Sequence, residues 1–142
     1  MDMEELEIVR EALEEYVRQR GLNKAKIFFF DQLSTFDQLI EDLRLGNERG
    51  REFARLVIER GLDYALTHRH SSIFDTLADK MEGNQGRFLF AYLLPVPIIL
   101  TPRQMAEHIR NRTEDGKIWV KGYLKAVMER RVFADKEQGL NR

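Results

Sequence analysis

The N-terminal part of the chain has the spacing of an amphipathic helix. Leu6, Val9 and Leu13 recur at steps of three and four residues, and charged residues fill most of the positions between them. This period places the apolar side chains on one face of a helix and the charged ones on the other. The pattern stops at Gly21, a residue type that commonly closes helices. We therefore expect a first helix that ends at Gly21.

Cap residues indicate further helix starts along the chain. Ser, Thr and Asn in such positions accept a hydrogen bond from the first turn of the helix that follows. The four starts are marked by Thr35, Asn47, Ser72 and Thr101, and the first and last of these have Gln three residues later, which fits a capping box. No segment shows the clean alternation of a half-buried strand. The predicted fold class is all-α, a compact multi-helix bundle.

Two aromatic runs, residues 27–30 and 88–94, are apolar all the way round if they are helical. Residues 27–30 and 96–100 are also short enough to be extended, but a helix-like pattern continues past the first run and prolines flank the second. We expect a central buried helix, with a dimer or partner surface as the alternative. No apolar run reaches the roughly 20 residues of a membrane span.

Length and charge favour one domain with two differently charged ends. The 142 residues suffice for a single core, and we predict one helical domain, residues 1–142. It would contain an acidic helical bundle over residues 1–94 and a basic helix pair over residues 101–133. Residues 1–50 hold 7 basic and 12 acidic residues, whereas residues 101–142 hold 10 and 6. A basic end is a reason to consider a polyanionic partner.

Two further features bound the class of protein. Cysteine is absent, which excludes disulfide scaffolds, thiolate metal sites and cysteine nucleophiles. The acidic start of the chain does not fit a secretory or transit signal, so we expect a cytoplasmic location.

The basic end has the outline of a helix-turn-helix. Residues 101–109 form a well-capped short helix, with Pro102 at its first position. A polar turn over residues 110–116 and a longer helix over residues 117–131 follow. In helix-turn-helix units the second helix enters the major groove of DNA, although the expected turn is longer than the usual three or four residues.

The second helix of this pair presents a row of lysines. Lys117, Lys121 and Lys125 are four residues apart and share one helix face, an arrangement suited to neutralising phosphates. Three arginines, Arg103, Arg110 and Arg130, could extend that surface. No base-reading Asn or Gln lies on the lysine face, and neighbouring carboxylates would repel phosphate. The alternative is an ordinary solvated lysine face.

Catalytic chemistry has weak support in the sequence. His68 and His70 are two residues apart and so do not share a helix face, and His108 is distant in sequence. Residues 83–87 contain two glycines but lack the rest of a phosphate-binding loop. We predict no catalytic residues, no metal ligands and no cofactor.

These patterns predict a non-catalytic regulatory binding protein. The first hypothesis is contact with DNA or RNA through Lys117, Lys121, Lys125, Arg103, Arg110 and Arg130. The alternative is a protein–protein interaction adaptor that uses its acidic and Phe-rich helices, with homodimerisation possible in either case. A small metal-dependent enzyme using the histidines is a third, weaker hypothesis.

Overall fold

A computed structural model describes residues 1–61, 72–83, 90–93 and 97–133. The chain divides into two compact units, each treated by itself below. Unit 1 comprises Met1–Asp63 together with Lys121–Arg142, and unit 2 comprises Tyr64–Val120. Of the described residues, 121–133 belong to the same compact unit as residues 1–61.

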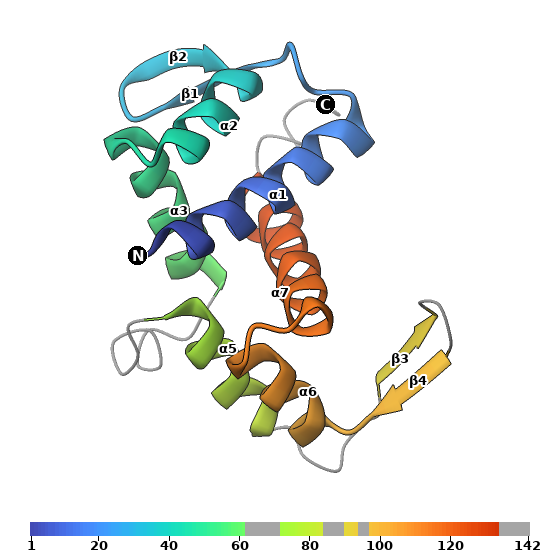
Figure 1. The fold of residues 1–142 in the computed structure, drawn as a ribbon. Helices are drawn as coiled ribbons and strands as arrows, with labels where there is room; N and C mark the ends of the chain where they lie inside the picture. The colour runs from blue at the N-terminus through green and yellow to red at the C-terminus, as the bar shows by residue number, and fades with distance from the viewer. Residues whose placement is uncertain (62–71, 84–89, 94–96, 134–142) are drawn as a thin grey trace. The chain divides into compact units, whose positions relative to one another are not determined.

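Unit 1 is mostly helical (Figure 1). It contains α1 (Met3–Arg20), β1 (Lys26–Phe29), β2 (Gln32–Thr35), α2 (Phe36–Leu45), α3 (Glu48–Gly61), the end of α7 (Glu114–Val127) and the π-helical turn η1 (Met128–Val132). Its core gathers apolar side chains from all four α-helices and the π-turn: Leu6, Val9, Leu13, Leu39, Leu43, Phe53, Val57, Leu124 and Met128. Phe133 completes this core by stacking on Tyr16, with the ring centroids 5.0 Å apart.

Unit 2 is built on a pair of packed helices, α5 (Ile73–Glu82) and α6 (Pro102–Arg110), followed by the start of α7. Phe74 and Leu77 of α5 are buried, as are Met105 and Ile109 of α6. Two short strands, β3 (Phe90–Leu93) and β4 (Pro97–Leu100), pair antiparallel between these helices in the sequence. The helical fold class is thus confirmed.

The predicted helix starts are confirmed at the level of individual hydrogen bonds. Thr35 and Gln38 form a complete capping box, as do Thr101 and Gln104. The Ser72 side chain accepts from the backbone N–H of Phe74, and Asn47 accepts from Gly50. Gly21 ends α1 in the left-handed conformation. These boundaries could be predicted because each cap forms a hydrogen bond within its own first or last turn.

Two expectations about local structure are wrong. Residues 27–30 do not belong to a buried helix, because β1 and β2 form an antiparallel hairpin with a two-residue turn. Residues 90–93 of the second aromatic run likewise form a strand and not a helix, and they pair with residues 97–100, part of the run that the sequence left open as extended. The second helix of the C-terminal pair begins at Glu114 and not at residue 117, so that three residues separate it from α6.

No helix in the described part of the chain is long and apolar enough to span a bilayer.

Candidate interaction surfaces

The turn of the β1–β2 hairpin holds two side-chain-bearing residues in the left-handed region. Phe30 has a φ of 58° and Asp31 a φ of 56°. Two-residue hairpin turns favour this conformation because it matches the twist of the strands, but Gly and Asn normally occupy it. A bulky residue such as Phe is a conformational outlier there. The turn therefore keeps an aromatic ring at its tip at the expense of backbone strain.

The inner face of the hairpin is firmly attached to unit 1. Ile27 and Ser34 are buried and lie opposite each other across the two strands. The Phe29 ring packs edge-on against Phe53 at a centroid distance of 5.8 Å. Arg49, itself buried, donates to the Ser34 hydroxyl and forms a 2.6 Å ion pair with Asp42. The hairpin is thus held by both apolar and charged contacts.

The outer face of the hairpin is apolar and exposed. Phe28 lies directly opposite Leu33 in the strand register, and each is 62% exposed. At the turn, Phe30 is a third exposed apolar side chain, 47% exposed, and its ring lies 6.2 Å from the inner-face ring of Phe29. We call Phe28, Phe30 and Leu33 the hairpin patch. Single exposed apolar residues are ordinary, but three that share one small hairpin are typical of an interaction site.

A hollow on the same unit lies where α1 and α2 meet. It has a volume of about 160 Å³ and is lined by Met3, Glu7, Arg10, Leu43 and Arg44. Met3 is 54% exposed, whereas Leu43 is buried and forms part of the floor. We call this feature the α1–α2 hollow.

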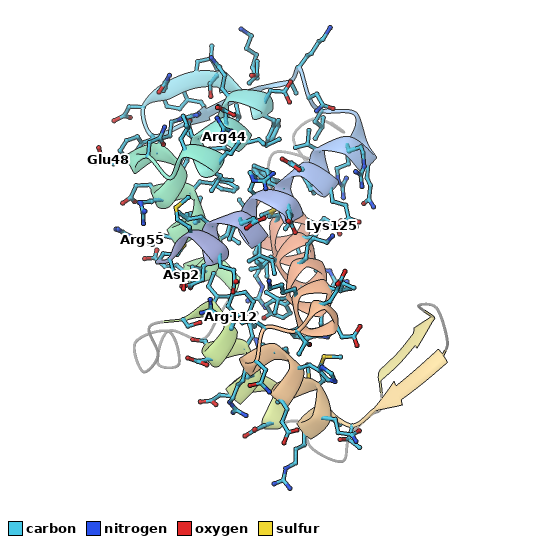
Figure 2. The ribbon with its side chains drawn as sticks, viewed as in Figure 1. Asp2, Arg44, Glu48, Arg55, Arg112 and Lys125 are labelled. Atoms are coloured by element: carbon cyan, nitrogen blue, oxygen red, sulfur yellow. The ribbon has the colours of Figure 1, made fainter. Side chains whose placement is uncertain are left out.

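Arginines wall the α1–α2 hollow, and each of them has a nearby acid. Arg10 is 2.6 Å from Glu14 and 3.9 Å from Glu7. Arg44, labelled in Figure 2, donates to Glu41, and this hydrogen bond lowers the pKa of the Glu41 carboxyl. Such exposed pairs within one helix are weak. The guanidinium groups can therefore exchange partners at little cost.

The lysine face predicted for α7 meets acidic and polar groups of α1. Lys121 Nζ lies 3.9 Å from a Glu15 carboxylate oxygen, and Lys125 Nζ lies 3.8 Å from the other. Lys125, labelled in Figure 2, also donates to the Gln19 side chain at 2.7 Å. Two of the six predicted phosphate ligands thus already have partners within unit 1.

Arg110 is the most heavily engaged of the predicted arginines. It bonds Asp79 at 2.7 Å and also Glu82, both on α5 of unit 2. The Arg110 hydrogen bond lowers the pKa of Glu82, and bonding to Glu82 and then Asp79 raises the pKa of Arg110. Lys117 is half-buried, whereas Arg103 of unit 2 and Arg130 of unit 1 are exposed. Among the described residues, Arg103 and Arg130 form no ion pair within 4 Å.

The α6–α7 connection resembles a helix-turn-helix more closely than the sequence indicated. Three residues link the helices, and Gly116 packs so tightly on α6 that an added Cβ would lie 2.3 Å from the His108 carbonyl oxygen. The first turn of α7, however, carries Glu114 and Asp115. Helix-turn-helix proteins read bases with this end of the second helix, where carboxylates repel phosphate.

The residues considered for catalysis form no recognisable centre in the described parts of the chain. His108 Nδ1 lies 2.8 Å from the Thr113 hydroxyl, a contact that closes the α6–α7 turn. His68 and His70 lie outside the described residues. No group of three or more potential metal ligands occurs within the parts that the structure describes. Gly83 ends α5, and the rest of the candidate phosphate loop is also outside the described residues.

No family model matches the chain, and neither a curated protein nor a solved structure shows significant similarity to it. Its surfaces must therefore be interpreted from their own chemistry.

Proposed function

We propose that this chain is a non-catalytic protein-interaction module that binds through the hairpin patch. One observation supports the proposal above the others, namely that Phe30 is exposed at a turn whose φ of 58° disfavours a bulky side chain. Asn or Gly at this position would relax the backbone and remove exposed apolar surface. A residue that both strains the backbone and exposes apolar surface is typical of a binding site.

The attachment of the hairpin also suits a binding role. Phe28 and Leu33 are presented on a hairpin fixed from behind by Phe53 and Arg49. Binding surfaces that are already ordered lose less conformational entropy on association. Exposed aromatic side chains on a fixed support are frequent binding hot spots.

The proposal is tested by replacing both Phe28 and Leu33 with Thr, which preserves strand propensity but removes the apolar surface. The control is Lys26→Thr, an exposed position on the same face of the hairpin. Each protein is immobilised and exposed to cell extract with chemical cross-linking. We expect proteins bound by the wild type and the control to be lost with the double variant. An identical set bound by all three proteins would refute the proposal.

Nucleic-acid binding by the α6–α7 helix pair is a second candidate, favoured by the three-residue connection and by the exposed Arg103 of α6. Glu15 provides its sharpest test, because this carboxylate lies beside Lys121 and Lys125. If the lysines bind phosphates, Glu15→Gln raises the affinity for duplex DNA or RNA in gel-shift assays. Added salt then lowers this affinity steeply. No shift with either nucleic acid at low salt excludes this candidate.

A further inference from the structure

Resting on the proposed function, we infer that Arg49 is the positioning residue of the hairpin patch, a side chain that fixes where the patch lies on unit 1. Arg49 lies in the first turn of α3. Its guanidinium donates to the Ser34 hydroxyl of β2 and to the Asp42 carboxylate of α2, and its Cζ atom lies 5.9 Å from the centre of the Phe29 ring of β1. One side chain thus joins both strands of the hairpin to the α2–α3 pair.

The α2–α3 pair holds this guanidinium in a defined place. The two helices approach so closely that an added Cβ on Gly50 would lie 2.3 Å from the Asp42 carbonyl oxygen. One oxygen of the Asp42 carboxylate accepts from Arg49 at 2.6 Å, and the other accepts from the Asn47 side chain at 2.8 Å. Because both bonds lie within the α2–α3 pair and its connection, the carboxylate is oriented without the hairpin. The guanidinium then determines the place of Ser34.

Arg49 is costly for the fold in three respects. Its side chain is 7% exposed, and removing a charge from water offsets much of the gain from an ion pair. Its Nε is buried and has no hydrogen-bond partner among the described residues, which adds a desolvation cost. A cation in the first turn of a helix also faces the positive end of the helix dipole. The stability of the fold therefore does not explain an arginine here, whereas the geometry that it imposes on the hairpin does.

The inner face of the hairpin is otherwise held by apolar contacts. Ile27 is buried, and the Phe29 ring packs edge-on against Phe53. Apolar burial is non-directional, whereas the planar guanidinium binds its acceptors in fixed directions. Without Arg49 we expect the hairpin to stay attached but to open more often. Binding through the patch then weakens, because a less ordered surface loses more conformational entropy on association.

Amide hydrogen exchange on the full chain tests the inference without a partner. The charge-free variant combines Arg49→Met with Asp42→Asn, because Arg49→Met alone would leave a half-buried carboxylate without its cation. We expect the amides of β1 and β2 to exchange roughly tenfold faster or more. The amides of α1 and the urea midpoint should show no loss of stability.

The matched control for the charge-free variant is Arg44→Met with Glu41→Gln, which removes an exposed ion pair within α2. This control should leave the exchange of the hairpin amides unchanged. Faster exchange in α1 and the hairpin alike, or unchanged exchange in the hairpin, overturns the inference.

Ser34→Ala isolates the link from Arg49 to β2. In the wild type it removes the hydroxyl that Arg49 binds, so exchange in the hairpin should rise. In the charge-free variant this bond is already absent, so the same substitution should add little. Equal effects of Ser34→Ala in the two backgrounds overturn the inference.

The inference and the proposed function fail separately. In the cross-linking experiment we expect the charge-free variant to capture severalfold less of the proteins whose binding needs Phe28 and Leu33. Unchanged capture of those proteins overturns the inference and leaves the proposed function standing. Capture that is indifferent to Phe28 and Leu33 refutes the proposed function, whatever the exchange rates of the hairpin.

Discussion

Arg60 and Arg131 each bond the other's backbone. Arg60 Nη1 donates to the carbonyl oxygen of Arg131 at 3.2 Å, and Arg131 Nη1 donates to that of Arg60 at 3.1 Å. Both carbonyls lie near the end of a helical segment, where backbone acceptors lack partners within the helix and cations are favoured. The Tyr123 hydroxyl donates to the next carbonyl of α3, that of Gly61, at 2.8 Å. These bonds join the end of the described chain to α3 within unit 1.

We therefore expect Arg60→Ala and Arg131→Ala each to lower the free energy of unfolding by about 0.5–1.5 kcal/mol, the usual net value of a hydrogen bond. Urea denaturation measures the change. The matched control is Arg55→Ala on α3, whose side chain is 62% exposed and, within the described parts of the chain, forms an ion pair only with Glu52 of the same helix. An equal loss in the control would show that the reciprocal bonds add nothing.

Two glycines are expected to respond to alanine with opposite signs. A Cβ on Gly50 would lie 2.3 Å from the Asp42 carbonyl oxygen, whereas nothing lies within 4 Å of one on Gly122. Gly50→Ala forces α2 and α3 apart and should cost about 1–3 kcal/mol or more. Gly122→Ala in the exposed interior of α7 should stabilise by about 0.5–1 kcal/mol. Thermal unfolding of both variants checks this, and the same sign for both would contradict the packing described for α2 and α3.

The hydrogen bond between Arg110 and Glu82 predicts part of the stability that unit 2 loses as the pH is lowered. Because the pKa of Glu82 is lower in the folded state than its ordinary value of 4.5, its contribution is present above about pH 4.5 and is lost as the pH falls through the folded-state pKa. Glu82→Gln should therefore lose less stability on acidification than the wild type. Urea midpoints at about pH 6 and about pH 3 measure this, with Glu59→Gln as the control. Equal losses in Glu82→Gln and the wild type would contradict the assignment.

The sequence predicted the capped helix starts well because caps are local. Thr101, Pro102 and Gln104 specify the start of α6 by contacts within one turn. The β1–β2 turn was missed because Phe30-Asp31 lacks the Asn-Gly signal of such hairpins. Phe28 and Phe29 are both apolar, so their alternation between outer and inner face left no trace in the pattern.

The partners of the lysine face could not be predicted from the sequence. Glu15 lies more than 100 residues before Lys121 and Lys125, and only the packing of α1 against the end of the chain brings them together. Spacing predicted correctly that the three lysines lie on one helix, but it contains no information about what that helix packs against.

The most direct test of the hairpin patch measures stability and association on one variant, Phe30→Asn. Because Asn adopts a positive φ more readily than Phe and removes exposed apolar surface, we predict a higher melting temperature than that of the wild type. Cross-linking to the bound partner, whether a second copy or another protein, should fall sharply in the same samples. A lower melting temperature with unchanged cross-linking would show that Phe30 serves the fold and would contradict the assignment of the hairpin as a binding surface.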